Sequence, residues 1–385
     1  MITAPIYLDY NATTPVASEV VDAMLPYLRE YFGNPSSAHA PGRIAAAAIN
    51  TSREQVAQLI NAQTREIIFT GCATEANNLA LLGAARAANP AKHHLVVSAV
   101  EHPSVMAVAE QLQRDGWRLS VVPVDGYGQV AAGDVVRALR PDTLLVSIMH
   151  ANNEVGTIQP IAEIARITRE RGILLHTDAA QSIGKIPVDV DAMGVDLLTL
   201  AGHKFYATKG IGVLYVRSGT SLHRVMFGAD QEHGWRAGTE NVPAIVGLGV
   251  AATLARACLV RLPGHMALLR DRLHDQLVAA VPDLALNGHS LDRLPNTLNI
   301  SFPGVTGRGL LAAVGADVTA SVGSACHSEH DTVSGVLAAM AINARRAAAA
   351  VRLSVGAMTS IADIDRAAQV LIQAWTRLVG SDTRV

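Results

Sequence analysis

Short apolar runs alternate with amphipathic stretches through most of the first 254 residues of this chain. The runs are apolar at consecutive positions, as in strands that are covered on both faces of a sheet. Most of the stretches between them carry apolar residues at helical spacing. This alternation predicts βαβ units and a mostly parallel sheet with helices on both faces. The predicted strands are 66–70, 95–100, 119–124, 143–149, 173–177, 197–200 and 212–216.

The pattern changes near residue 254, where helices and half-buried strands no longer alternate regularly. The predicted elements after that point are a helix, an alternating strand, a second strand and a final helix: 265–281, 296–302, 351–355 and 361–378. Their mixture predicts an α+β unit. We therefore expect a large α/β domain over 16–254 with a seven-stranded sheet, and a smaller α+β domain made of 1–15 and 255–385.

Composition limits the classes of partner and location. The 385 residues are 50% hydrophobic and 17% charged, with a net charge of −2 and no basic stripe, so we expect neither disorder nor nucleic-acid binding. No apolar run reaches the roughly 20 residues of a membrane span, so we expect no membrane partner. Residues 1–10 have no signal-peptide character. The sparse cysteines Cys72, Cys258 and Cys326 favour a reducing compartment, and we expect a cytoplasmic protein.

Ligands of open α/β sheets bind beyond the carboxyl ends of the strands, so the residues that follow each strand are the first candidates. Small residues, including Ala73 and Thr74, follow the strand at 66–70 and open a helix. The N–H groups at such a helix start bind phosphate, although a helix cap by Thr74 explains the same residues. His102 follows the next strand. It can stack on a planar cofactor or carry a proton, or it can be held by backbone groups at a helix start.

Three more candidates follow the next two central strands. Asn153 lies in the polar run 150–156 and can bind a hydroxyl or carboxylate group, or form an Asx turn. Asp178 ends a buried apolar run and needs a cationic partner there, for which a protonated pyridine nitrogen is suitable. A helix-capping role for Asp178 is equally compatible with the spacing. Gln181 is close enough in sequence to reach a hydroxyl group on the same ring.

The fifth strand end is followed by Gly202-His203-Lys204. A lysine at the rim of a buried strand is costly unless it is paired or uncharged, and an uncharged lysine amine forms Schiff bases with aldehydes such as pyridoxal phosphate. Taken alone, a solvated loop lysine explains the same stretch. Five consecutive strand ends, however, supply partners for a phosphate, an aromatic ring, a hydroxyl, a pyridinium and an aldehyde. Together they favour a pyridoxal-phosphate site.

Three further candidates lie outside the predicted sheet. Thr239 precedes a hydrophobic helix and can bind a phosphate across a subunit interface, or merely cap the helix. Cys326 lies among small residues with histidines nearby, which suits a nucleophilic thiolate. A zinc site there lacks a second ligand pair at metal spacing, so we expect no metal. Arg352, in an apolar run, needs a carboxylate, either from a substrate or from an internal salt bridge.

These residues occur in motifs that resemble the cysteine desulfurases and selenocysteine lyases of the class V aminotransferase family, which are fold-type I pyridoxal-phosphate enzymes. The resemblance extends nearly from end to end, and the motifs are specific in combination. They are Tyr7-Leu-Asp-Tyr-Asn-Ala-Thr-Thr-Pro15, Gly33-Asn-Pro-Ser-Ser37, Phe69-Thr-Gly-Cys-Ala-Thr-Glu75, Glu101-His102, Asn152-Asn-Glu-Val-Gly156, His176-Thr-Asp-Ala-Ala-Gln181, Gly202-His-Lys204, Arg236-Ala-Gly-Thr-Glu-Asn241, Gly323-Ser-Ala-Cys326 and Arg352-Leu-Ser-Val-Gly356.

The resemblance implies a role for each candidate residue. It makes Lys204 the Schiff-base lysine, Asp178 the partner of the pyridinium nitrogen and His102 a residue that stacks on the ring and moves protons. The remaining cofactor contacts are assigned to Ala73, Thr74, Asn153, Gln181 and His203, joined by Thr239 from the other subunit of a homodimer. Arg352 takes the substrate carboxylate, with Asn11 and Asn153 beside it. Cys326 attacks the substrate sulfur and becomes a persulfide.

The implied activity is that of a pyridoxal-phosphate-dependent cysteine desulfurase, which converts L-cysteine to L-alanine. It would pass sulfur to an acceptor such as a scaffold or carrier protein, for iron–sulfur cluster, cofactor or tRNA synthesis. One departure from many relatives is Ala201, where a phosphate-binding serine is common. The loop at 321–331 is more similar to selenocysteine lyases, so a lyase acting on L-selenocysteine is the first alternative. An aminotransferase, in which Cys326 is incidental, and a non-catalytic scaffold are further alternatives.

Overall fold

The computed structural model describes residues 5–323 and 334–382. Its central element is a seven-stranded sheet in the order β2-β8-β7-β6-β5-β3-β4. Only β8 runs antiparallel to its neighbours, so the mostly parallel α/β sheet expected from the sequence is confirmed. The strands are β2 (Ile67–Thr70), β3 (His94–Ser98), β4 (Arg118–Val122), β5 (Thr143–Ser147), β6 (Leu174–Asp178), β7 (Leu197–Ala201) and β8 (Gly212–Val216).

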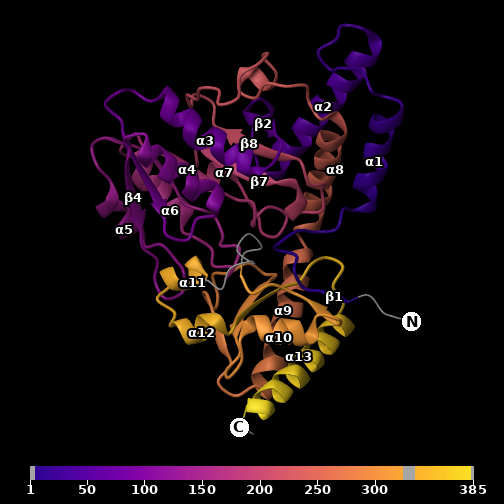
Figure 1. The fold of residues 1–385 in the computed structure, drawn as a ribbon. Coiled ribbons are helices and arrows are strands. Elements are labelled where there is room, and N and C mark those ends of the chain that lie inside the picture. Colours follow the sequence, from indigo (N-terminus) through magenta and orange to yellow (C-terminus); the bar gives the residue numbers. More distant parts are fainter. Residues whose placement is uncertain (1–4, 324–333, 383–385) are drawn as a thin grey trace.

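Helices cover both faces of this sheet (Figure 1). Successive residues of a strand point to opposite faces, and here both faces are apolar: Leu197 packs in the cluster with α3 and α4, while Leu198 packs in the cluster with α2, α6 and α8. That explains why the strands read as continuous apolar runs. The helices of this part are α1 (Ser18–Arg29), α2 (Ala40–Leu59), α3 (Ala73–Ala87), α4 (Pro103–Arg114), α5 (Ala132–Ala138), α6 (Ile161–Arg169), α7 (Val190–Met193) and α8 (Val242–Cys258).

The C-terminal part, orange and yellow in Figure 1, has its own apolar core around an antiparallel sheet in the order β12-β10-β9. Its strands are β9 (Ala285–Asn287), β10 (Thr297–Ser301) and β12 (Ala350–Ser354). Its helices are α9 (Leu262–Ala280), α10 (Gly307–Val314), α11 (Gly335–Ala339), α12 (Ala344–Ala348) and α13 (Ile361–Asp382). The division into domains at residue 254 stays a prediction.

The N-terminal segment joins the two parts. The strand β1 (Ile6–Tyr7) pairs in parallel with β11 (Val318–Thr319), and Leu8 is buried in the core of the C-terminal part. Figure 1 shows β1 beside that part. The chain then crosses to the large sheet, where the N–H of Thr14 donates to the carbonyl of His203. Residues 9–14 are thereby held against the carboxyl edge of the sheet.

Within the described residues, no single helix has the length and apolar composition of a membrane span. The helices α8 and α9 meet those two criteria only when they are taken together, across a bend of 74°.

Candidate functional site

A cavity of about 250 Å³ lies at the carboxyl edge of the large sheet. Ends of β6 and β7, the starts of α3 and α4, the N-terminal segment and β12 all contribute to its wall. Ten residues singled out in the sequence line this one cavity: Asn11, Ala73, Thr74, His102, Asn153, Asp178, Gln181, His203, Lys204 and Arg352. A wider hollow of about 660 Å³ between α10, α12 and the end of α13 contains none of them.

Lys204 ends a short 3-10 helix, Gly202–Lys204, that directly follows β7. Its amine donates hydrogen bonds to the backbone carbonyls of Asn11, at 2.7 Å, and Ala12, at 2.8 Å. Both acceptors belong to the N-terminal segment, 192 or more residues away in sequence. The half-buried lysine therefore spans the cavity from the sheet edge to that segment.

Asp178 is the last residue of β6 and is 6% exposed. One carboxylate oxygen accepts a hydrogen bond from the N–H of Ala180 at 2.9 Å, which is an Asx turn, and the other accepts from the Asn77 amide at 2.8 Å. No described side chain forms an ion pair with it. A buried carboxylate on a cavity wall without a counter-ion is suited to a cationic ligand group.

His102 is the N-cap of α4, where its Nδ1 accepts a hydrogen bond from the backbone N–H of Ser104 at 3.1 Å. The Ser104 hydroxyl lies 2.8 Å from the same nitrogen. The helix-start contact and the place on the cavity wall are therefore compatible, because one edge of the ring caps the helix while the residue still lines the cavity.

Gln181 and the buried Lys185 are linked through Asn11. The Gln181 amide donates to the backbone carbonyl of Asn11 and accepts from Lys185 at 2.8 Å. The Lys185 amine also donates to the Asn11 side chain at 3.0 Å. Burial, followed by the charges of Lys204 and Arg352, holds the pKa of Lys185 well below its ordinary value. These bonds fix the orientation of the Gln181 amide: its NH₂ group faces the Asn11 carbonyl and its oxygen faces the Lys185 amine.

Two titratable groups beside the cavity have strongly shifted pKa values. Burial, with Lys204 and Lys209 adding to it, lowers the pKa of His203 to about 4, so this ring is neutral near pH 7. Its Nδ1 lies 3.1 Å from the Thr13 hydroxyl. Burial raises the pKa of Glu101 to about 8, despite its bonds to Ser98 and to the N–H of Met149, so that carboxyl is protonated near pH 7.

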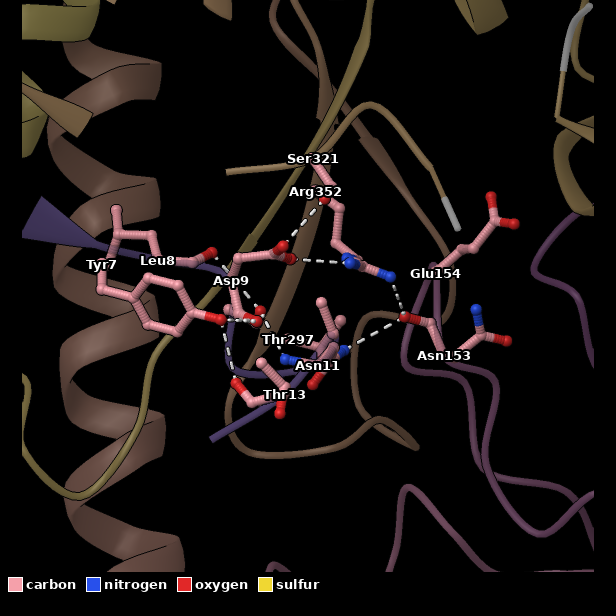
Figure 2. A network of polar contacts seen from close by, with 12 residues as sticks. Tyr7, Leu8, Asp9, Asn11, Thr13, Asn153, Glu154, Thr297, Ser321 and Arg352 are labelled. Atoms are coloured by element: carbon pink, nitrogen blue, oxygen red, sulfur yellow. Dashed lines mark hydrogen bonds and ion pairs between the residues drawn. The ribbon is translucent and has the colours of Figure 1, made fainter. Parts of the chain in front are cut away.

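Figure 2 shows how Arg352 is held. Its guanidinium forms an ion pair with Asp9 at 2.7 Å and donates to the backbone carbonyl of Asn153 at 3.1 Å, while its Nε is buried with no partner among the described residues. The second oxygen of Asp9 accepts from the Ser321 hydroxyl at 3.0 Å. The internal salt bridge that the sequence left open thus exists, and it uses only some of the five N–H groups of Arg352.

The first turn of α3 also lines the cavity. Its N-cap, Cys72, makes no side-chain capping bond, and both Ala73 and Thr74 line the cavity. The glycine that begins β8 permits this arrangement, because a Cβ at Gly212 would lie 2.6 Å from the backbone carbon of Cys72. An uncapped helix start on a cavity wall is suited to an anionic ligand group.

One predicted residue, Thr239, does not line this cavity: it is exposed and borders a separate small hollow with Arg236. Cys326 lies outside the described residues. No sequence pattern had indicated a role for Asp9, Asn77, Ser104 and Lys185. The only indication in the sequence was that each is a polar residue within a motif or an apolar stretch. Their partners are distant in sequence, so no local pattern identified their roles. No cluster of three or more metal-ligating side chains occurs in the part of the chain that the structure describes.

Comparisons with known proteins agree with this geometry. Residues 6–367 match the family described as "Aminotransferase class-V". The chain is 45% identical to the cysteine desulfurase of Trichormus azollae over 374 residues, which cover 97% of this chain and 93% of the relative. The proteins named cysteine desulfurase IscS in Dictyoglomus turgidum and Methanosarcina thermophila are each 44% identical over 367 residues, which cover 95% of this chain.

Two solved structures extend the likeness to three dimensions. A NifS-like protein superposes with a TM-score of 0.92 at 35% identity, covering 97% of this chain and all of the other. SspA in complex with cysteine superposes with a TM-score of 0.81 at 36% identity, covering 92% of this chain and 99% of the other.

Proposed function

The chain belongs to the class V aminotransferase family, among enzymes of the cysteine desulfurase type, and from that premise we propose that its cavity binds pyridoxal phosphate and desulfurates L-cysteine to L-alanine. The observation that carries the proposal is that Lys204, Asp178 and Arg352 line one cavity although they come from three separate segments. An amine, a buried carboxylate and a guanidinium meet there. That is the set needed for an aldehyde, a pyridinium and a substrate carboxylate.

The described residues fit the cofactor. The Asp178 carboxylate, 6% exposed and without a counter-ion among the described residues, suits the protonated ring nitrogen. The uncapped start of α3, with Ala73 and Thr74, suits the phosphate, and neutral His203 adds a hydrogen-bonding group. Lys204 would hold the aldehyde carbon through its amine. When bound, the ring withdraws electrons from the substrate carbon next to nitrogen.

The chain's own residues then divide the remaining tasks. Arg352 has N–H groups beyond those used by Asp9 and Asn153 and would orient the substrate carboxylate. Lys204 would carry protons at the reacting carbons, and His102 would serve as a hydrogen-bonding group in the same cavity. The Cys326 thiolate would attack the substrate sulfur, breaking its bond to carbon. One thiol and L-cysteine thereby give a persulfide and L-alanine, with the proton of the attacking thiol ending on the former CH₂ carbon.

The test compares the wild-type protein with Cys326→Ala, both loaded with pyridoxal phosphate. L-Alanine and sulfide are measured with L-cysteine and a thiol reductant, which releases sulfide from the persulfide. We expect the variant to keep the cofactor absorbance and to lose sulfide formation. Cys258→Ala is the matched control, because Cys258 is an exposed cysteine at the end of α8, outside the cavity.

Other outcomes contradict the proposal in different ways. A full desulfuration rate in Cys326→Ala excludes that thiol as the nucleophile. Turnover of L-selenocysteine without turnover of L-cysteine would identify a selenocysteine lyase instead. Pyruvate-dependent transamination by both proteins would identify an aminotransferase.

We also propose a homodimer and transfer of the persulfide sulfur to an acceptor protein of the iron–sulfur or sulfur-carrier class. The dimer is supported by Thr239, which is exposed and does not line the cavity of its own chain, as expected for a residue that serves a partner's phosphate site. Thr239→Ala should weaken cofactor binding in a dimer. A cofactor affinity unchanged in a monomeric species would contradict this assignment.

A further inference from the structure

His102 and Asp178 are connected by a chain of hydrogen bonds through two side chains that the proposed reaction leaves unassigned. Asn77, in α3, donates from the same amide nitrogen to Asp178, at 2.8 Å, and to the Ser104 hydroxyl, at 2.8 Å. The Ser104 hydroxyl lies 2.8 Å from Nδ1 of His102. All four groups are near the cavity, and Asn77 is completely buried.

The donor and the acceptor of each hydrogen bond in this series can be assigned by starting from the Asp178 carboxylate. An ionised carboxylate only accepts, so Asn77 must present its NH₂ group to Asp178; the opposite orientation would place two acceptors 2.8 Å apart. The same NH₂ group donates to the Ser104 oxygen, and the Ser104 hydroxyl hydrogen is then available for Nδ1 of His102. The cost is that the Asn77 oxygen stays buried without a partner among the described residues.

A second contact leads to the same assignment independently. The backbone N–H of Ser104 is an obligatory donor, and it points to Nδ1 of His102 at 3.1 Å. A proton on Nδ1 would face this N–H and the Ser104 hydroxyl together. The ring proton therefore belongs on Nε2.

We propose that Asn77 and Ser104 are positioning residues that hold His102 as the neutral imidazole protonated at Nε2, so that His102 enters the reaction as a hydrogen-bond donor and not as a base. The tautomer is a property of the folded chain alone. Its effect on turnover rests on the proposed function. Proton abstraction then falls to Lys204, which lines the same cavity.

The charged and titratable groups around this chain are consistent with a neutral ring. The Asp178 carboxylate accepts its hydrogen bonds from Asn77 and Ala180. Glu101 directly precedes His102 in the sequence, and burial raises the pKa of its carboxyl to about 8. Arg352, which also lines the cavity, is a cation that disfavours a second positive charge there.

Nitrogen-15 NMR of histidine-labelled protein tests the tautomer without any turnover. The chain has 14 histidines, and comparison with His102→Gln assigns the signal. We expect a pyridine-type Nδ1 and a pyrrole-type Nε2 at pH 7, in both cofactor-free and cofactor-loaded protein. A pyrrole-type Nδ1, or a fully protonated ring, would overturn the proposal even if the enzyme desulfurates L-cysteine normally.

Variants test the positioning role. Ser104→Ala should shift the Nδ1 resonance and lower kcat roughly tenfold with a smaller change in KM, whereas Ser104→Thr, which keeps the hydroxyl, should restore both. Ser120→Ala is the matched control, because the Ser120 hydroxyl lies 2.9 Å from another buried histidine, His94, away from the cavity. It should leave the His102 signals and kcat unchanged. An unaltered Nδ1 signal and kcat in Ser104→Ala would show that Ser104 does not position His102. A wild-type spectrum as expected, without L-alanine formation, contradicts the proposed function alone.

Discussion

The two walls of the cavity are built in opposite ways. On the sheet-edge side, polar groups keep unused hydrogen-bonding or charge capacity. Asp178, in the lining, has no counter-ion among the described residues, and Glu101, outside the lining, has a buried oxygen with no partner among them. On the wall formed by the N-terminal segment and the C-terminal part, most polar groups have partners, and the exception among the described residues is Nε of Arg352. Asn11 is the centre of that wall and is 1% exposed.

The bonds of Asn11 show how complete the second wall is. Its amide donates to Thr297, at 2.8 Å, and to the carbonyl of Asn153, and its side-chain oxygen accepts from Lys185 and Asn296. Figure 2 shows part of this network. A side chain so occupied serves as scaffold for this wall, and the substrate contact that the resemblance implied for it stays a prediction. The difference teaches that unsatisfied groups mark the chemistry and satisfied groups mark the support.

The strongest way to break the comparison is to remove Lys204, the group that reaches from one wall to the other. We expect Lys204→Ala to lower L-alanine formation at least roughly a thousandfold, because both the amine that would hold the cofactor and a proton carrier are lost. Lys209→Ala, at an exposed lysine outside the cavity, should change the rate less than about twofold. A Lys204→Ala protein with the wild-type rate and visible spectrum would contradict the site.

Asp9 tests whether the second wall is support. Asp9→Ala leaves the guanidinium of Arg352, whose side chain is 2% exposed, without its counter-ion. We expect a loss of about 3–5 kcal/mol in the free energy of unfolding, together with a higher KM for L-cysteine, because an unpaired buried charge is costly and the guanidinium loses its orientation. Denaturant unfolding of the cofactor-free protein measures the first effect.

Asp317→Ala is the matched control for this loss, since Asp317 pairs with Arg366 on the surface with both side chains about half exposed. It should change stability by less than about 1 kcal/mol. Equal effects of the two substitutions would show that the buried network contributes no more than a surface pair.

Glu101 tests whether an incompletely hydrogen-bonded group on the sheet-edge side lowers the stability of the fold as the pH rises. Its pKa is raised by burial from 4.5 to about 8, so the folded chain keeps a proton that the unfolded chain releases. Its contribution to stability is fully present below pH 4.5 and is lost as the pH rises through 8. Glu101→Gln removes this titration. Its stability relative to wild type should therefore rise across this window, by at most about 1.4 kcal/mol per pH unit.

Thermal unfolding of both cofactor-free proteins between pH 5 and 9 measures that difference. A difference that is independent of pH would mean that Glu101 titrates alike in the folded and unfolded chains. The comparison of the walls would then lose one of its two examples.

The smallest expected effect concerns Ala201, which is 2% exposed at the end of β7 and lines the cavity. Ala201→Ser adds one hydroxyl near the proposed phosphate site, and we expect the cofactor to bind about threefold more tightly, within the net value of one hydrogen bond. Ala180→Ser, beside Asp178, is the control and should not tighten binding. Weaker binding by Ala201→Ser, measured by fluorescence titration, would place the phosphate elsewhere.

Much of the fold was predictable because it depends on local periodicity. Each of the seven predicted strands occurs in the large sheet, and the positions after the strand ends supplied most of the cavity lining. The site was predictable to that extent because parallel strands bring their carboxyl ends to one edge. Asp9, Asn77 and Ser104 were missed, since their roles depend on partners that no local pattern specifies.

The sequence by itself determined the alternation of strands and helices, and hence the edge at which Lys204, Asp178 and His102 would meet. Only the tertiary structure decided which groups become hydrogen-bond and ion-pair partners. The Asp9–Arg352 pair joins residues 343 positions apart, and the Asn77–Asp178 bond joins residues 101 positions apart. Such contacts arise only after the strand order and the return of the N-terminal segment have placed distant segments side by side. The local sequence therefore supplies the chemical groups, whereas their charge states and hydrogen-bond partners are set by the assembled fold.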